Sequence, residues 1–428
     1  MTKLTLSLTF IFLTQFLFAQ QPCGTHDYES YLNAKFPGFN EAINSSRQES
    51  SNAVNRLNKV GKNDTVYRVP IVFHIVWNTQ TQNIHDSLVY SQMKALNESY
   101  RHNHKDTANI RNAFKPLAGD TKIEFYLADR DPSGNPTNGI NRVKTTRTDF
   151  NDGMSTQGED VKFASSGGVD AWNPEKYLNI WVCKFTLNGN VAVAAYAFPP
   201  VNAKNWNSIY FKSLELQGVV TNYQYVGVKN PNDKSSNSIR ERTLVHEVGH
   251  YLGLRHVWAD KTSCTGEDDG IKDTPLCRSA TTNCSTIKNT CTEPNDKPDM
   301  TENYMDYTPY PCTVMFTRDQ VELMRYNLLN LRSKLYKLKV TIAPALPNDN
   351  ITVSPNPVKG DMKLLFVEKG TYNLFLVDII GQSVANEEIK VGDSYDYNFN
   401  TGNLRPGFYY LNITQSNNVV LKQRILVE

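Results

Sequence analysis

Three histidines and a glutamate fall in one register in the stretch HEVGHYLGLRH, residues 246–256. On a helix, residues four apart share a face, so His246 and His250 can bind one metal ion. Gly253 can adopt a left-handed turn without a steric penalty, which brings His256 back to the same ion. Glu247 lies next to the first ligand, where its carboxylate can take a proton from metal-bound water.

Three imidazoles and one open position are typical of a catalytic zinc site, because structural zinc sites have four protein ligands. The alternative is a surface helix with unrelated histidines. The chain has only 8 histidines, and three of them occur in this register. We therefore predict one catalytic Zn²⁺ ion, with Glu247 as general base.

A second motif, NYMDY at residues 303–307, resembles the methionine turn of the metzincin metallopeptidases. In that clan a methionine packs beneath the zinc site, and a thioether is a soft filler for such a floor. The resemblance implies that Met305 forms the floor and that Tyr307 is a catalytic residue near the scissile carbonyl.

The net charge and the N-terminal segment indicate which partners and which cellular location to expect. Its 428 residues carry 45 basic and 43 acidic side chains, so nothing calls for a nucleic-acid partner. Residues 1–19 combine Lys3 with a short apolar run and a small residue, Ala19, which indicates a cleaved signal peptide. A retained anchor is the alternative. No later run is long and apolar enough for a transmembrane segment.

Composition divides the rest of the chain. Polar residues 20–64 suit a propeptide, residues 65–338 a catalytic domain, residues 339–350 a Pro- and Asn-bearing linker, and residues 351–428 a small all-β sandwich. Within 65–338 the periodicity predicts strands at 68–77, 121–128, 178–183 and 191–198, and helices at 86–102, 238–251 and 317–337. The predicted class is α+β, with a cleft between two lobes.

Residues 66–335 resemble the pappalysin family of metzincins, in its secreted bacterial members. The matching segments, beside the two motifs above, are VPIVFHIVW at 69–77, LNIWVC at 178–183, DTP at 273–275 and CTVMFT at 312–317. The resemblance implies a metzincin-like, two-lobed zinc endopeptidase that hydrolyses proteins or peptides and functions as a monomer. The alternative is a non-catalytic adhesin on the same scaffold, which a lost ligand or base would indicate.

The resemblance also implies calcium near the specificity pocket. The segment 267–274 supplies oxygen ligands of the kind that calcium prefers, from Asp268, Asp269, Asp273 and Thr274. A solvated acidic loop is the alternative.

The chain has 7 cysteines, and export makes disulfides expected, although an odd count leaves one thiol unpaired within the molecule. The family implies the pairs Cys264–Cys291 and Cys284–Cys312. Cys183 and Cys277 then remain, and a third bridge between them is predicted.

The last of the 7 cysteines, Cys23, lies in Cys-Gly-Thr, which resembles the cysteine motif of family propeptides. A thiolate there can occupy the open zinc position and keep a zymogen latent. A lipid-modified or incidental cysteine is the alternative.

The last domain resembles the C-terminal sorting domain of the type IX secretion system. The matching segments are VSPNP at 353–357, VDIIG at 377–381, LRPGFYYLNI at 404–413 and LKQRILV at 421–427. The resemblance implies export through the periplasm and outer membrane by that machinery, to the cell surface or the medium. A carbohydrate-binding sandwich is the alternative.

One position departs from the family. Members selective for basic residues carry an acid just before the cysteine that follows the methionine turn, and here Pro311 precedes Cys312. We therefore expect the residue after the cut to be apolar or mixed rather than strictly arginine.

Overall fold

The computed structural model describes residues 21–57, 65–150, 159–186, 193–202, 213–227, 240–265, 268–285, 287–292, 297–338, 351–378, 382–416 and 418–428. The predicted signal peptide and linker lie outside these residues. The helices are α1 (Thr25–Lys35), α2 (Phe39–Leu57), α3 (Asp86–Tyr100), α4 (Arg240–Tyr251) and α5 (Arg318–Asn330). The helices predicted at 86–102 and 238–251 correspond to α3 and α4, whereas α5 ends seven residues before the predicted limit.

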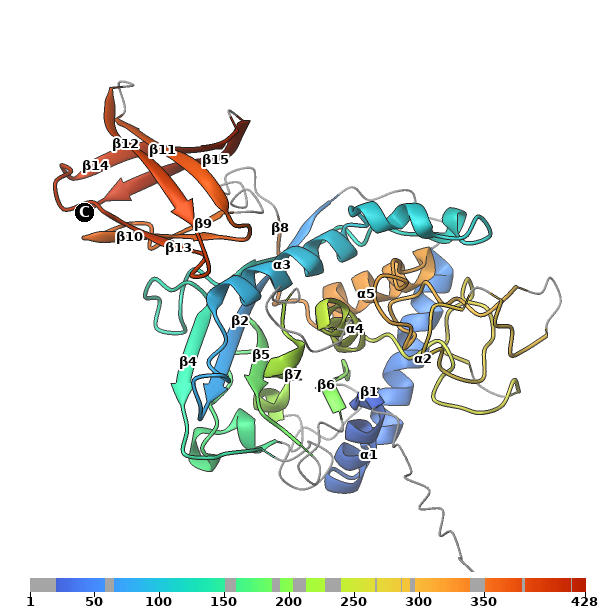
Figure 1. Cartoon of the computed structure of the whole chain (residues 1–428). Coiled ribbons are helices and arrows are strands. Elements are labelled where there is room, and N and C mark those ends of the chain that lie inside the picture. Colours follow the sequence, from blue (N-terminus) through green and yellow to red (C-terminus); the bar gives the residue numbers. More distant parts are fainter. Residues whose placement is uncertain are drawn as a thin grey trace, which may run out of the picture.

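A mixed sheet forms the frame of the larger unit (Figure 1). Its strands run in the order β1-β6-β7-β5-β2-β3, and β4 and β8 also pair with the long strand β2. Their bounds are β1 (Gln21–Cys23), β2 (Tyr67–Trp77), β3 (Ile123–Leu127), β4 (Ile140–Lys144), β5 (Leu178–Cys183), β6 (Val193–Ala197), β7 (Val219–Asn222) and β8 (Lys337–Leu338). Strands β2, β3, β4, β5 and β7 are parallel, and β6 runs antiparallel to β7.

The two faces of this sheet bury different cores, because successive side chains of a strand point to opposite sides. On one face, alternate residues of β2 and β5 pack with α3, α4 and α5; Phe73, Ile180 and Val182 belong to this first core. On the other face, Trp181, Cys183 and Val220 belong to a second core. The first core carries α4, and α4 carries the histidine motif.

The second core is completed by the N-terminal segment. Tyr28 and Leu32 of α1 and Phe39, Ala42 and Ile43 of α2 are buried in it. The sequence of residues 20–64 is polar overall and offered no reason to expect these two helices. A few apolar side chains at helical spacing are sufficient, because the sheet supplies the rest of the apolar surface.

The C-terminal unit is all-β, as predicted. A sheet of order β13-β10-β9 and a sheet of order β12-β11-β14-β15 enclose one apolar core. The strands are β9 (Ile351–Ser354), β10 (Asp361–Phe366), β11 (Gly370–Asp378), β12 (Ser383–Val391), β13 (Asp396–Asn400), β14 (Gly407–Gln415) and β15 (Asn418–Val427). Strand β12 was not expected, because most of its side chains are polar and only Ile389 and Val391 are buried.

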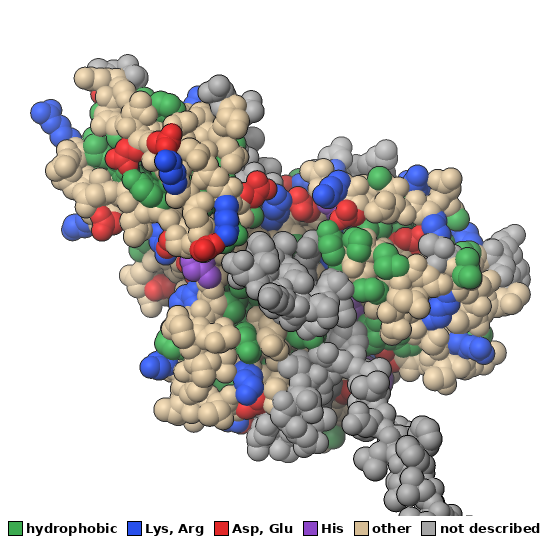
Figure 2. Space-filling model, in the orientation of Figure 1, with side chains coloured by type: hydrophobic (Ala, Val, Ile, Leu, Met, Phe, Trp, Pro, Cys, Tyr) green, Lys and Arg blue, Asp and Glu red, His purple; other side chains and the backbone are tan. Residues whose placement is uncertain are grey.

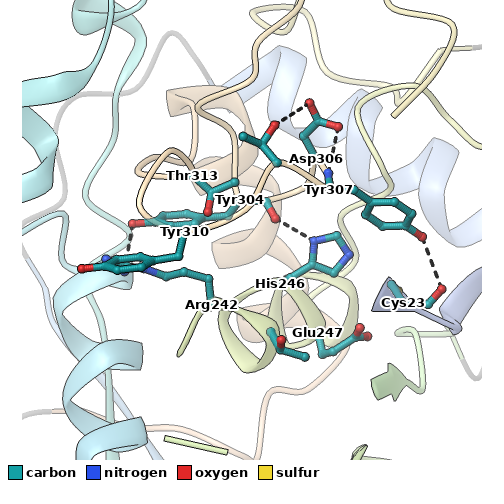
Figure 3. Close-up of a pocket in the computed structure, with 11 residues that line it drawn as sticks. Cys23, Arg242, His246, Glu247, Tyr304, Asp306, Tyr307, Tyr310 and Thr313 are labelled. Atoms are coloured by element: carbon teal, nitrogen blue, oxygen red, sulfur yellow. Dashed lines mark hydrogen bonds between the residues drawn. The ribbon is translucent and has the colours of Figure 1, made fainter. Parts of the chain in front are cut away.

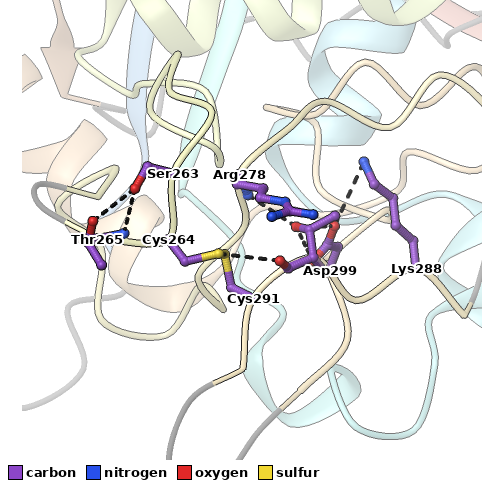
Figure 4. Close-up of a disulfide and its surroundings, with 8 residues drawn as sticks. Ser263, Cys264, Thr265, Arg278, Lys288, Cys291 and Asp299 are labelled. Carbon is purple, nitrogen blue, oxygen red and sulfur yellow. Dashed lines mark hydrogen bonds and ion pairs between the residues drawn. A yellow bond between two sulfur atoms is a disulfide. The ribbon is translucent and has the colours of Figure 1, made fainter.

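Two disulfides hold the loops between α4 and α5. Cys264 pairs with Cys291, and Cys284 pairs with Cys312, as predicted. Beside the first bridge the buried carboxylate of Asp299 accepts hydrogen bonds from the amide and hydroxyl of Thr290 (Figure 4). These links fasten a long segment whose described residues form no helix or strand.

The predicted Cys183–Cys277 bridge is wrong, because both residues are free buried thiols. Cys183 ends β5 on the face of the second core, whereas Cys277 belongs to the first core. Residues Leu178, Ile180 and Val182 point to the first core, so the alternation of the strand directs Cys183 away from it.

Acidic and basic side chains are interspersed on the face seen in Figure 2, in keeping with the net charge of +2.

Candidate active site

Helix α4 and the turn after it bring the three motif histidines together. The Nε2 atoms of His246 and His250 are 3.0 Å apart, and each lies 3.2 Å from Nε2 of His256. Nitrogens about 2.0 Å from a tetrahedral zinc ion lie about 3.3 Å apart. The spacing of the three side chains therefore fits one zinc ion.

The second nitrogen of each ring fixes its protonation. Nδ1 of His246 donates to the carbonyl of Tyr304 at 2.7 Å, and Nδ1 of His250 donates to the carbonyl of Leu254 at 2.8 Å. A carbonyl oxygen can only accept, so Nδ1 carries the proton and Nε2 presents a lone pair. Burial also lowers the pKa of His246 to about 3.

His256 is oriented by two residues that follow it. Its Nδ1 is hydrogen-bonded to the carboxylate of Asp260, and the ring of Trp258 stacks on it at 4.3 Å between centroids. Gly253 makes the turn between helix and third histidine with φ 100°. A Cβ at Gly253 would come within 2.1 Å of Nδ2 of Asn327, so the position needs glycine for space as well as for conformation.

Met305 lies directly under α4. It is fully buried, and a Cβ placed on Gly249, between the two helical histidines, would meet its sulfur at 2.6 Å. The turn is fixed by Asn303, which accepts a hydrogen bond from the amide of Met305 and exchanges two hydrogen bonds with Gln320. Gln320 in turn completes a capping box with Thr317 at the start of α5.

The N-terminal segment covers the site. Strand β1 pairs in parallel with β6, placing Cys23 opposite Ala195. The sulfur of Cys23 lies within 4.8 Å of a ligand nitrogen of each of the three histidines, and the residue is 3% exposed. Among the described residues, these four side chains form the one cluster suited to a metal ion.

Glu247 is also held by this segment. The hydroxyl of Thr25 donates to the Glu247 carboxylate at 2.9 Å and accepts from the amide of Ala197 at 2.9 Å. Burial raises the pKa of Glu247 to about 8, and hydrogen bonds from Cys23 and Thr25 oppose the rise. Tyr307 also contacts this segment, because its hydroxyl donates to the carbonyl of Cys23 at 3.3 Å (Figure 3).

A pocket extends from the histidines between α4 and the segment after the methionine turn (Figure 3). Arg242 lines it with 6% exposure, and its guanidinium faces the rings of Tyr304 and Tyr310. Asp306 also lines the pocket, but its carboxylate accepts from the amides of Thr281 and Tyr307. Pro311 is exposed and does not line this pocket.

The residues expected to bind calcium lie in one loop, but the structure does not bring the carboxylates of Asp268, Asp269 and Asp273 together as a metal-binding cluster. The hydroxyl of Thr274 donates to the carboxylate of Asp269, Asp268 accepts from the amide of Gly270, and Asp273 accepts from the amide of Asp319. Burial raises the pKa values of Asp269 and Asp273. Residues 266 and 267 lie outside the described part of the chain.

Comparison with known proteins places the chain in a family. The family model described as pregnancy-associated plasma protein-A matches residues 163–329. An extracellular metalloprotease of Arthroderma gypseum is 26% identical over 311 residues, which cover 72% of this chain and 83% of that protein. The structure of mature mirolysin of Tannerella forsythia, solved with a cleaved peptide, is 39% identical in sequence and has a TM-score of 0.56. The similar region comprises 63% of this chain and 95% of the mirolysin chain.

A Tannerella forsythia promirolysin variant extends the similarity. It is 35% identical, covers 74% of this chain and 97% of its own, and has a TM-score of 0.60. The chain belongs to the pappalysin family of metallopeptidases. The predictions of fold class and of an exported metalloprotease are thereby confirmed.

The C-terminal unit also has an assignment. A model for a secretion-system C-terminal sorting domain matches residues 352–428, which confirms the sorting domain over the carbohydrate-binding alternative. This metallopeptidase is therefore exported, to the cell surface or the medium. None of the described helices has the length and apolar character needed to cross a membrane.

Four residues at the site were not predicted, namely Thr25, Arg242, Trp258 and Asp260. An aspartate four positions after the third histidine was a usable signal, because zinc-ligating histidines commonly donate their second nitrogen to a carboxylate. Thr25 and Arg242 gave no such signal, since their roles depend on segments distant in the sequence.

Replacing Gly253 by alanine tests the turn. The new methyl group collides with Asn327 and strains a left-handed residue, so His256 should move and bound metal should fall well below one equivalent. Gly270→Ala is the control, because Gly270 has φ 82° but a Cβ added there would have no atom within 4 Å. Metal content is measured by atomic spectroscopy. Full occupancy in Gly253→Ala would contradict the assigned role of the turn.

Proposed function

We propose that this pappalysin is a zinc-dependent endopeptidase whose ion is held by His246, His250 and His256. The observation that supports this most directly is the approach of three unprotonated Nε2 atoms to within 3.2 Å of one another, beside a buried glutamate. Zinc bound there supplies a polarised scissile carbonyl and a water of lowered pKa.

Glu247 is the proton carrier of this proposal. Its position in the motif puts the carboxylate beside the proposed ligands, and it is covered by Cys23 and Thr25 of the segment that we propose to be removed. Once that segment has left, this carboxylate can accept a proton from water and later give it to the leaving amine. Tyr307, whose ring lies 4.9 Å from that of His256, is placed to donate a hydrogen bond to a developing oxyanion.

Replacing Glu247 by alanine tests the base. The variant should keep its zinc and its fold, because the three imidazoles are untouched, while turnover of casein falls about 10²- to 10⁴-fold. Glu215→Ala, an exposed glutamate, is the control and should retain full activity. Activity of Glu247→Ala within a few-fold of the parent would contradict the assignment, and activity insensitive to a chelator would contradict the zinc proposal.

We further propose that residues 20–64 keep the enzyme latent. Cys23 would supply the fourth zinc ligand, Thr25 binds the base, and β1 occupies the edge of β6. Substrate therefore meets three obstacles at once: a filled metal position, an engaged carboxylate and a paired strand edge.

Latency can be tested with Cys23→Ala in the full chain. Loss of the fourth ligand leaves a position open to water, so the variant should process itself faster than the parent. Cys183→Ala is the control, because Cys183 is also a free buried thiol but lies in the second core. Processing is followed by electrophoresis over time. A latent and stable Cys23→Ala chain would show that the cysteine does not hold the metal position.

The pocket beside α4 is our candidate for binding the side chain that follows the cut. It contains the Arg242 guanidinium, whose nearest carboxylate, Asp106, is 3.5 Å away, and the Nε of Arg242 is buried without a hydrogen-bond partner. Asp306 is already engaged by backbone amides. Among the described residues, the acids that line this pocket are Asp306 and the proposed base Glu247, so a basic substrate side chain would meet a like charge and no carboxylate assigned to pair with it, which makes its burial costly.

Sequencing the products of a peptide library should therefore show depletion of arginine and lysine directly after the cut. Apolar and uncharged side chains should be retained there, since tyrosine rings line much of the pocket. Arg242→Met serves as the comparison and should relieve the depletion if it remains folded. An excess of arginine after the cut in the parent enzyme would overturn this reading of the pocket.

Calcium in the loop of Asp268, Asp269, Asp273 and Thr274 remains a proposal. It is supported by one orphaned atom, since Oδ1 of Asp273 is buried without a hydrogen-bond partner, and by two buried carboxyl groups whose pKa values burial raises. Bound calcium would stabilise their charged forms.

We propose boundaries of 1–19 for the signal peptide, 65–338 for the catalytic domain and 351–428 for the sorting domain. Deleting residues 351–428 should leave a folded, active peptidase in the periplasm, because the sandwich has its own core and gives no side chain to the site. Fractionation of the host followed by casein cleavage checks this. Normal surface display or release of the truncated chain would contradict the role of the domain.

A further inference from the structure

A buried ammonium and a buried carboxylate lie in the second core, on the opposite face of the sheet from α4. Lys162 is 0% exposed and Glu159 is 3% exposed. The Lys162 ammonium donates to the carbonyl of Leu216 at 2.8 Å and lies 5.5 Å and 5.4 Å from the ring centroids of Trp181 and Tyr196. Nothing in the proposed catalysis uses either charge.

Both groups depend on α1 for their remaining partners. Lys162 donates to the Tyr28 hydroxyl at 2.9 Å, and that hydroxyl donates to Glu159 at 3.1 Å. Tyr31 also donates to Glu159, at 3.2 Å, and Lys35 forms an ion pair with it. Among the described residues, every hydrogen bond given to the Glu159 side chain comes from α1.

A phenol suits this position better than other side chains. Its hydroxyl can accept from the ammonium and donate to the carboxylate at the same time. Its ring packs 4.7 Å from the ring of Tyr196, and Tyr28 is fully buried. If α1 departs, water must replace all these donors to Glu159 and one of the two acceptors of Lys162, and the apolar surface of the second core that α1 covers becomes exposed. The peptidase domain thus favours keeping a tyrosine here.

The geometry points to a tyrosine-binding site, formed by Glu159, Lys162 and Tyr196, that keeps the propeptide bound after the chain is cut. The inference rests on the proposed role of residues 20–64. Tyr28 is three residues beyond Thr25, which binds Glu247, so a helix anchored at this site also holds its first residue in the active site. Cleavage between propeptide and enzyme therefore does not by itself release activity; the fragment must dissociate or be digested.

The test uses the full chain with a specific protease site placed between residues 57 and 65. All chains carry Glu247→Gln, which removes the proposed base but can still accept the hydrogen bond from Thr25, so the fragment is not digested and the readout does not require the proposed activity. After cutting, release of the N-terminal fragment is followed by gel filtration and mass spectrometry. The parent fragment should co-elute with the enzyme, and Tyr28→Phe should accelerate its release about 10- to 100-fold, the effect of losing hydrogen bonds to charged groups.

Two further variants show whether faster release is specific to the Tyr28 hydroxyl. Glu41→Gln, an exposed change on α2, is the control and should release its fragment at the parent rate. In a Lys162→Met background, Tyr28→Phe should accelerate release less than it does alone, because one of the two hydrogen bonds of the Tyr28 hydroxyl is already absent and only the bond to Glu159 is left to lose. If Lys162→Met fails to fold, Tyr28→Phe alone decides. Immediate release of the parent fragment, or release of Tyr28→Phe within twofold of Glu41→Gln, would overturn the proposal.

Discussion

Three imidazole lone pairs that face one another in a buried site form the constraint on which the rest of this structure depends. Such an arrangement repels itself unless a cation lies between the nitrogens, and burial prevents protonation from relieving the problem. Each imidazole must therefore be held in place through its other nitrogen, Nδ1. Two backbone carbonyls and the Asp260 carboxylate do this, and they come from the methionine turn and from the segments after α4.

The segments that orient the histidines are themselves held by further contacts. The methionine turn is held by the Asn303–Gln320 amide pair, which belongs to the cap of α5, and α5 packs in the same core as α4. The described residues of the loops between these elements form no helix or strand, and two disulfides close these loops. An exported protein can use such bridges, since they persist in oxidising compartments. The catalytic geometry is thus fixed by contacts rather than by one continuous element.

The N-terminal segment contacts the peptidase domain at two places. Beside the three histidines it contributes the sulfur of Cys23, and it binds the carboxylate of Glu247 through Thr25. On the opposite face of the sheet it completes an apolar core, and the Tyr28 hydroxyl is hydrogen-bonded to both Lys162 and Glu159. Neither set of contacts uses many residues, which explains why the composition of residues 20–64 resembles a poorly folding sequence. Most of the apolar surface belongs to the sheet.

The sequence alone determined the histidine register, the glutamate beside it and the all-β C-terminal unit, because local spacing and strand periodicity encode them. The methionine turn and the two disulfide pairs were predicted from the resemblance to a family, since neither spacing nor periodicity selects them. The tertiary structure decided which face Cys183 occupies relative to Cys277, how Thr25 reaches Glu247, that Arg242 rather than Pro311 lines the pocket, and that Tyr28 connects Lys162 to Glu159. These contacts join residues as far as 222 positions apart. Periodicity says which side of an element a residue occupies, but only the packing of the elements decides what it meets there.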